Sequence, residues 1–357
     1  MQNNNFVDKS AGRMHTQPLK LIFKGRLEFG SQRTFDMVLR HWQNRVETYF
    51  KSDILFKAEE AFSAEDFALV VPQQTLMHSE KAWRSTTALL QEAAQYAIAG
   101  NVWAWCLDNG RLIAATNIEP DSDKVAVQEY RRGCGLVGQV GMEREATEAL
   151  SRAIEKYERH ALAYERRGYV NYKLKNFNDA LHDFSKSIRF NPNNPEPYYG
   201  CGKVKMLKND WENAVVDFEQ AVKRSLALQP LHWLARLKKG ESLFHAKKFP
   251  EAAAEFRHYL RREFDANDPN FSRRRRAAYF LGKALLAMDD APAALEAFDQ
   301  TLSIASGDDL VPDSEGLLHR AIAKHRAGKP EFAHDLKAAA QMGSSEAARL
   351  LIEWQEA

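Results

Sequence analysis

Apolar and polar positions follow two different periods along the chain. In residues 19–29, apolar side chains alternate with charged ones, which is the period of a half-buried β-strand. In residues 161–188, apolar and aromatic side chains recur three and four positions apart, which is the period of helices with one buried face. The chain is therefore predicted to be α+β, with a mixed region first and an all-helical region after it.

The region up to about residue 120 carries alternating strand and helix signals. Asn109-Gly110 lies between two β-rich runs and supplies the positive φ angles of a tight hairpin turn. The order β-α-β-β-α-β-β predicts a small two-layer α/β sandwich, and a ferredoxin-like βαββαβ arrangement plus a hairpin strand is one topology that fits it. The predicted elements are a strand at 19–29, a helix at 31–49, strands at 53–62 and 66–74, a helix at 79–100 and a hairpin at 101–119.

The helical region repeats itself with a step of 34 residues. Four residue types return after that step: Tyr164, Gly168, Ala180 and Phe184 are matched by Tyr198, Gly202, Ala214 and Phe218. The same step backwards leads to Tyr130, Ala146 and Leu150. Small side chains on facing helices let two backbones approach, and the aromatic ring fills the space beside them. A period of this size indicates an array of helical hairpins, each burying its apolar face on the next.

This pattern resembles the tetratricopeptide repeat family over about residues 127–343. The regular copies are EYRRGCGLVGQVGMEREATEALSRA, AYERRGYVNYKLKNFNDALHDFSKS and PYYGCGKVKMLKNDWENAVVDFEQA. Two looser copies keep the spacing, with Gly240, Ala252 and Phe256 in one and Gly282, Ala294 and Phe298 in the other. In the last copy Ala321 and Ala333 are twelve apart, but Lys337 stands where the aromatic residue should be. The resemblance implies about six helix pairs in an all-α superhelix.

These patterns divide the chain into four parts. Pro120 and the polar residues 121–124 form a junction between the sandwich and the repeats. The predicted parts are a flexible tail at 1–18, the sandwich at 19–120, the repeats at 127–343 and a capping helix at 344–357 that starts at Ser344 or Ser345.

Composition excludes several classes of protein. The net charge is +2 over 357 residues, so the chain as a whole is not a polycation for nucleic acid. No apolar run has the length of a membrane span, and the polar start lacks the apolar core of a signal peptide. The three cysteines, Cys106, Cys134 and Cys201, are far apart, as expected of free thiols in a reducing compartment. We therefore expect a cytoplasmic protein without a membrane segment.

Candidate catalytic and cofactor motifs have structural explanations. Residues 133–138, GCGLVG, fit GxGxxG, but the repeat register places them in a helix without a βαβ unit, so the glycines are expected to serve packing. His41, and His78 beside Ser79, lack a nucleophile elbow or an oxyanion donor nearby. The remaining histidines lack metal-ligand spacing. We expect no catalytic residue, no metal and no cofactor.

A basic cluster lies between residues 256 and 276, where seven arginines face three acidic residues and give a local charge of +4. Three interpretations stay open: solvated side chains paired with nearby carboxylates, a surface for an acidic protein, or a phosphate-binding patch. The arginines are Arg257, Arg261, Arg262, Arg273, Arg274, Arg275 and Arg276.

The family resemblance implies that the first helices of the pairs line a groove for a peptide or a partner helix. Tyrosines interleaved with cations suit an acidic partner, because rings give contact area and cations steer carboxylates. The chaperone-tail clamp of one subclass is disfavoured, because Glu165, Tyr169 and Gly200 stand at its positions. The implied groove residues are Glu165, Tyr169, Tyr172, Lys173, Tyr199, Lys203, Met206, Leu237, Phe244, Arg276, Tyr279 and Lys283.

The leading hypothesis is a non-enzymatic adaptor or scaffold whose sandwich domain provides a second docking or self-association surface. A nucleic-acid binder that uses Arg273–Arg276 is one alternative, although residues 1–120 carry 13 basic and 13 acidic residues and no RNP-like aromatic strand. An enzyme or ligand-binding sandwich, with substrate selection by the repeats, is the other. The sequence specifies neither the partner nor the oligomeric state.

Overall fold

The computed structural model describes residues 6–7, 18–50, 53–305 and 311–355. The chain divides into two compact units, Met1–Asn193 and Asn194–Ala357, which we call the first and the second unit. Most of the predicted tail at 1–18 lies outside the described residues.

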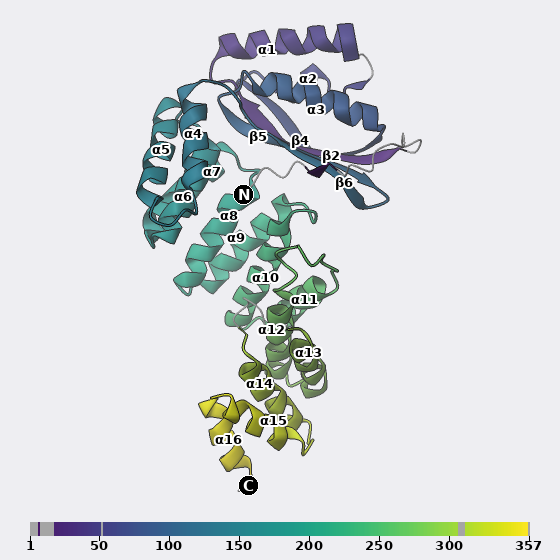
Figure 1. Cartoon of the computed structure of the whole chain (residues 1–357), viewed down its shortest axis with the longest axis vertical. Helices are drawn as coiled ribbons and strands as arrows, with labels where there is room; N and C mark the ends of the chain where they lie inside the picture. The colour runs from purple at the N-terminus through teal and green to yellow at the C-terminus, as the bar shows by residue number, and fades with distance from the viewer. Residues whose placement is uncertain (1–5, 8–17, 51–52, 306–310, 356–357) are drawn as a thin grey trace. The chain divides into compact units, whose positions relative to one another are not determined.

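The first unit contains an antiparallel sheet covered on one face by helices (Figure 1). Leu21 and Phe23 of the sheet pack against Trp42 of α1 and Leu90 of α3, so the core lies between the two layers. The strand order is β1-β6-β5-β2-β4-β3. The strands are β1 (Phe6–Val7), β2 (Leu19–Glu28), β3 (Phe62–Ser63), β4 (Ala68–His78), β5 (Ala99–Asp108) and β6 (Arg111–Ile118). The helices are α1 (Gln32–Arg45) with its π-helical end η1 (Val46–Phe50), α2 (Ala58–Ala61) and α3 (Glu80–Ala94).

Two backbone features shape this sheet. Asn109 and Gly110 have φ angles of 47° and 83°, so the β5–β6 hairpin has the predicted tight turn. The pairing of β2 with β4 shifts register between Phe23 and Gly25, next to Pro72 of β4. Proline cannot donate a ladder hydrogen bond, and the short β3 pairs with β4 only at Ala68 and Leu69, so Pro72 lies on an open edge.

The α+β class is confirmed, but one finer prediction for the sheet is wrong. Residues 53–62 were expected to form a strand, whereas they contain α2 and only the first residue of β3. The run is amphipathic, and Ala58 and Ala61 face the core as one turn of helix. The ferredoxin-like arrangement fits, because β2, β3, β4 and β5 lie in the antiparallel order β5-β2-β4-β3, with α1 before β3 and α3 before β5 as the connecting helices. Strand β6 is the additional hairpin strand.

The sheet is joined to the helices that follow it in the first unit by a charged cluster. Glu28 of β2 is 2% exposed and accepts a hydrogen bond from Tyr157 Oη at 2.6 Å. Arg26 Nε lies 3.0 Å from Glu28, and Arg159 donates to Asp66 at 2.7 Å. Burial raises the pKa of Glu28, and the nearby Arg26 and Tyr157 only partly offset that shift.

The rest of the described chain consists of helix pairs (Figure 1). In the first unit they are α4 (Val125–Leu136) with α5 (Glu143–Lys156), and α6 (Ala161–Lys173) with α7 (Phe177–Phe190). In the second unit they are α8 (Pro195–Leu207) with α9 (Trp211–Arg224), α10 (Pro230–His245) with α11 (Phe249–Leu260), α12 (Arg274–Ala287) with α13 (Ala291–Ser303), and α14 (Asp313–Arg326) with α15 (Phe332–Gln341). Helix α16 (Ser345–Gln355) follows, and Ser344 Oγ accepts from the Ala347 amide at its start.

A glycine–phenylalanine contact explains the spacing of sixteen residues within a pair. A Cβ atom added to Gly168 would lie 2.9 Å from the Phe184 ring, and one added to Gly282 would lie 2.6 Å from Phe298. The ring of the second helix therefore occupies the space that a side chain on the first helix would need. A helical glycine costs about 1 kcal/mol against alanine, whereas burying a phenylalanine contributes about 1.5–3 kcal/mol.

The last pair departs from the predicted alignment by one residue. Leu336, which is fully buried, takes the place of the aromatic ring, while Lys337 is exposed and Ala333 only half-buried. The amide of Phe332 bonds to Lys329, three residues back, whereas Ala180 in the regular copy bonds to Asn176, four residues back. This tighter turn shortens the path into α15 by one residue, so the expected twelve-residue spacing does not hold there.

Candidate functional site

An ion pair between the two helices recurs in four of the six described pairs, each time from the acidic residue that precedes the buried ring or its substitute. In α4–α5 an ion pair instead joins Glu129 of α4 to Arg152 of α5. In α7, Asp183 precedes Phe184 and accepts two hydrogen bonds from Arg167 of α6, at 2.9 and 2.7 Å. Asn171, one turn further along α6, donates to the same carboxylate at 3.1 Å. In the second unit, Asp217 of α9 pairs with Lys205 and Glu255 of α11 pairs with Lys239 and Arg236.

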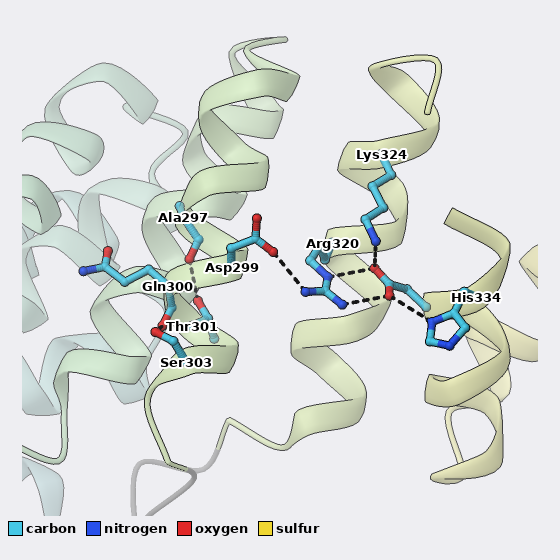
Figure 2. A network of polar contacts seen from close by, with 9 residues as sticks. Ala297, Asp299, Gln300, Thr301, Ser303, Arg320, Lys324 and His334 are labelled. Atoms are coloured by element: carbon cyan, nitrogen blue, oxygen red, sulfur yellow. Dashed lines mark hydrogen bonds and ion pairs between the residues drawn. The ribbon is translucent and has the colours of Figure 1, made fainter. Parts of the chain in front are cut away.

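The α14–α15 pair has the fullest version of this contact, shown in Figure 2. Asp335 is 1% exposed and accepts from Arg320 Nε at 2.7 Å and Nη2 at 2.8 Å, while Lys324 Nζ lies 2.8 Å from it. Arg320 also donates to Asp299 of α13 at 2.9 Å and so links two neighbouring pairs. Burial would raise the pKa of Asp335, but hydrogen bonds from Arg320 and Lys324 outweigh it and hold the pKa below its ordinary value.

The α12–α13 pair lacks this contact. Ala297 precedes Phe298, and buried leucines, Leu281 and Leu285, stand on α12 where α6 has Arg167 and Asn171. Around Ala297, the two helices of this pair therefore pack through apolar side chains alone. Cations of α12 lie instead on the side of the helix that faces α10 and α14, at Arg276 and Lys283.

Polar contacts connect the first helices of the second unit to one another. Glu241 of α10 is 1% exposed and accepts from Arg276 of α12, at 2.7 and 3.1 Å, and from Lys238 at 2.8 Å. Burial opposes ionisation of Glu241, but Lys238 and Arg276 keep its pKa below the ordinary value. Tyr279 of α12 donates to Glu315 Oε2 of α14 at 2.9 Å.

Lys283 of α12 lies over three aromatic rings. Its Nζ is 5.4 Å from the centroid of Phe244, 5.3 Å from Tyr279 and 5.8 Å from Phe280, within the range of cation–π attraction. Burial lowers the pKa of Lys283, and Glu315 and Glu346 attract its charge only weakly from a greater distance.

On α8, Lys203 Nζ lies 5.7 Å from the centroid of the Tyr199 ring, and that ring lies 5.6 Å from the ring of Phe218. Met206, one turn further along α8, is half-buried. A repeated set of aromatic and cationic side chains thus lies on α8, α10 and α12, and its chemistry suits non-covalent recognition.

Comparison with known proteins agrees with this arrangement of paired helices. Residues 161–194 match one tetratricopeptide repeat model, and residues 202–270 match another. The chain is a tetratricopeptide repeat protein. Its repeats therefore indicate a function in protein–protein interaction.

Several solved structures resemble the repeat region. PilF of Pseudomonas aeruginosa is 16% identical, with 66% of this chain and 98% of that one covered and a TM-score of 0.50. YrrB, described as a tetratricopeptide repeat protein with an unusual peptide-binding site, is 16% identical over 59% of this chain and 100% of its own, with a TM-score of 0.49. A repeat protein of Cytophaga hutchinsonii is 20% identical over 63% and 84%, with a TM-score of 0.48. At these identities the likeness concerns the fold alone.

The groove residues implied by the tetratricopeptide resemblance differ in accessibility. Glu165, Leu237 and Tyr279 are buried, and Leu237 belongs to the core of the second unit. Their contribution is therefore to packing and to positioning their neighbours. For the remaining nine groove residues, a role in binding stays a prediction. They are Tyr169, Tyr172 and Lys173 in the first unit, and Tyr199, Lys203, Met206, Phe244, Arg276 and Lys283 in the second.

The predicted patch of seven arginines is wrong for Arg275. Its side chain is 1% exposed and donates to the carbonyls of Val311 at 2.9 Å and Ile304 at 2.6 Å, and to Asp313. Successive helical residues point about 100° apart, so four consecutive arginines at the start of α12 cannot share one face. Arg276 points to Glu241, and Arg273 and Arg274 are half-buried, which leaves Arg257, Arg261 and Arg262 exposed.

The other sequence motifs of this repeat protein have local roles. Gly133 of the GxGxxG stretch lies in α4, where an added Cβ would be 2.6 Å from Leu150, so it serves packing. Ser79 Oγ accepts from the Ala82 amide as the N-cap of α3, and His41 contacts Glu92 at 3.1 Å. Among the described residues, no cluster of His, Cys, Asp and Glu could hold a metal, and no helix is long and apolar enough to span a membrane.

Sequence reasoning missed the acidic residues that pair with the cations of the first helices. Asp183, Asp217 and Glu255 directly precede the repeat phenylalanines, so the periodic alignment carries a signal that could have identified them. Glu241 carries no such signal, because its partner Arg276 lies 35 residues away.

Proposed function

We propose that this protein is a non-enzymatic adaptor that binds a peptide or a partner helix on the first helices of its second unit. We define the first-helix face by Tyr199, Lys203 and Met206 of α8, Phe244 of α10, and Arg276 and Lys283 of α12. The family relationship supports the general function, and the chemistry of these side chains supports the choice of surface.

The observation that carries this proposal is the set of contacts between successive first helices. Arg276 reaches from α12 to Glu241 of α10, and Lys283 lies over Phe244 of α10. The aromatic and cationic side chains of neighbouring pairs are thus held together instead of being scattered over separate helices. Rings held in place give contact area at little cost in side-chain entropy, and cations between them favour an acidic partner.

A photo-crosslinking amino acid tests the location of the surface. We would place it at Met206 on the first-helix face and, in a matched variant, at Val216 on the second helix α9, which is 54% exposed. We expect partners from the native lysate to be captured at Met206 and not at Val216. Equal capture at both positions, or capture at Val216 alone, would contradict the proposed surface.

A double substitution tests the side chains themselves. Tyr199→Ala with Lys203→Ala removes a ring and a cation from α8, so we expect binding of the captured partner to weaken roughly tenfold or more. The helical circular dichroism should stay unchanged. Because Tyr199 also packs on Phe218, the single variant Lys203→Glu serves as a control that leaves packing intact. Unchanged affinity in both variants would count against this face.

We further propose that the sheet region of the first unit acts as a second docking or self-association surface. Tyr49 of η1 is 67% exposed and Met37 of α1 is 41% exposed, so this side of the helical layer offers apolar area to a partner. A Tyr49→Lys variant, followed by light scattering and by capture of partners, tests whether this surface binds anything. Unchanged mass and unchanged capture would remove it from the proposal.

A further inference from the structure

Most cations on the first helices form an ion pair with a carboxylate, whereas Lys283 forms none with the residues that the structure describes. Lys205 pairs with Asp217 at 2.7 Å, Lys239 with Glu255 at 3.0 Å, and Arg276 with Glu241 at 2.7 Å. Among the residues that the structure describes, none gives Lys283 an ion pair or a hydrogen bond, and Glu315 and Glu346 act on it only at longer range.

The place of Lys283 on α12 explains this difference. The positions that face the acid of the second helix in other pairs are taken by Leu281 and Leu285, and Lys283 lies two residues, or about 200° around the helix, from each of them. Lys283 instead extends over Phe244, Tyr279 and Phe280, with its ammonium 5.3–5.8 Å from the three ring centroids. The rings fix the position of the ammonium without neutralising its charge.

A half-buried ammonium that the protein holds in place but leaves without a counter-ion is suited to bind an anion. Part of its desolvation has already occurred in the folded chain, so an incoming anion gains an electrostatic contact that is stronger than one in bulk water. The side chain is also confined by the rings, which lowers the entropy lost on binding.

The surroundings favour a singly charged anion over a phosphate group. Glu315 and Glu346 are near enough to act on Lys283, and they would repel a dianion more strongly than a monoanion. The neighbouring Arg276, which could add a second cation, is already bound by Glu241. One ammonium with two carboxylates at longer range is therefore matched to the single charge of an aspartate or glutamate side chain.

We propose that Lys283 binds the side-chain carboxylate of an acidic residue in a peptide that occupies the first-helix face. This assignment rests on the proposed function and adds to it the charge and position of one specificity-determining contact. In this view, Phe244, Tyr279 and Phe280 are positioning residues that hold the ammonium toward the bound peptide.

The probe is a set of peptides selected against the full chain from a random library of twelve-residue sequences. The selected peptides are synthesised with blocked ends, so that only side chains carry negative charge. We expect one Asp or Glu position to be enriched. Replacing that Glu by Gln should weaken binding to the wild-type chain roughly tenfold, but should change binding to Lys283→Met less than about twofold.

The control is Lys337→Met, which removes the same charge from an exposed position on α15. It should bind the Glu and Gln peptides with the same ratio as the wild-type chain. Lys283→Arg should retain most of the preference for Glu. A melting curve by circular dichroism checks that Lys283→Met keeps its fold, because the aliphatic part of methionine still covers the rings.

Three results would overturn the assignment: no enrichment of acidic residues, an equal Glu-to-Gln loss in wild type and Lys283→Met, or tighter binding when the Glu is replaced by phosphoserine. The crosslinker at Met206 separates this failure from that of the proposed function. If the crosslinker at Met206 captures the selected peptides while Lys283→Met binds them as the wild-type chain does, the proposed surface is supported and the proposed role of Lys283 is wrong. If Met206 captures none of them, the surface itself is wrong.

Discussion

The α14–α15 and α12–α13 pairs have the same architecture but different contacts between their helices. In α14–α15, Arg320 and Lys324 of the first helix bind the buried carboxylate of Asp335 on the second helix. In α12–α13, Ala297 stands at the position of this aspartate, and Leu281 and Leu285 stand at the positions of the two cations. Both pairs form regular helices, so the ion pair is not needed to bring two helices together. What differs is the chemistry of the contact: two cations bind a buried carboxylate in α14–α15, whereas apolar side chains meet at the same level in α12–α13. A buried ion pair thus favours one alignment of the helices without necessarily adding stability.

The largest expected effect comes from removing only the acid of the buried ion pair. Asp335→Ala leaves Arg320 and Lys324 without their shared carboxylate in a largely buried position, so we expect a loss of about 3 kcal/mol in unfolding free energy. Urea unfolding followed by circular dichroism measures it. The control is Asp299→Ala, which contacts the same Arg320 from a carboxylate that is 56% exposed and should cost less than about 1 kcal/mol. Similar losses in the two variants would refute the distinction.

Overpacking tests the apolar contact that the helix pairs share. Ala214→Leu adds a larger side chain at a fully buried position beside the Gly202–Phe218 contact, and we expect a cost of about 1–3 kcal/mol. Lys208→Leu, at the exposed end of α8, should change stability by less than about 0.5 kcal/mol. If both changes had the same effect on the unfolding midpoint, the assignment of buried and exposed faces would be wrong.

Converting one type of pair into the other should have a smaller effect. The variant Arg320→Met, Lys324→Met and Asp335→Leu replaces all three charges of this contact by apolar side chains, similar to α12–α13, and leaves none of the three behind. Replacements of this kind are often neutral or stabilising, so we expect a change within about 1 kcal/mol of wild type. A loss as large as that of Asp335→Ala would mean that Arg320 or Lys324 has a further structural role.

The smallest expected effect is a difference in pH dependence between two buried carboxylates. The pKa of Asp335 is lowered, so its stabilisation is present above the unfolded pKa of about 4 and is lost as the pH falls below it. The pKa of Glu28 is raised by burial, so its contribution is present below about 4.5 and is lost as the pH rises through the folded value.

Hydrogen exchange between pH 3 and 6, corrected for the intrinsic rate, separates the two carboxylates by the helices and strands that carry them. Asp335→Asn should abolish the acid-dependent loosening of α15, and Glu28→Gln should abolish the opposite trend in β2. Trends of the same sign at both sites would contradict the assigned shifts.

Local spacing made the helical pairs predictable, while contacts between distant residues were not. The recurrence of Gly168 and Phe184 at Gly202 and Phe218 is a packing contact within one hairpin, and the sequence displays it directly. Alternation along a strand does not reveal its neighbours, such as the pairing of β2 with β5 some 80 residues away. The order of elements, β-α-β-β-α-β-β, is what predicts the ferredoxin-like arrangement.

The candidate site was predictable only in part, for the same reason. Tyr199 and Lys203 are one turn apart on α8, so their shared side of the helix follows from the sequence. The contact of Arg276 with Glu241, and the lack of a counter-ion for Lys283, depend on the packing of α12 against α10. The alignment of the last pair failed because a three-residue turn at Lys329 has no clear signature in the sequence.

The bridge from Arg320 to Asp299 and Asp335 has a consequence for how the end of the chain comes apart. In a repeat protein each hairpin meets only its neighbours, so unfolding can proceed one hairpin at a time from a free end. The guanidinium of Arg320 binds carboxylates of two successive hairpins, so the unfolding of one hairpin is coupled to that of the other. When α15 unfolds, Arg320 loses Asp335 and is no longer held in place beside Asp299 of α13. The C-terminal hairpins should therefore fray as a cooperative block, and a truncation that removes α15 and α16 should loosen α13 as well.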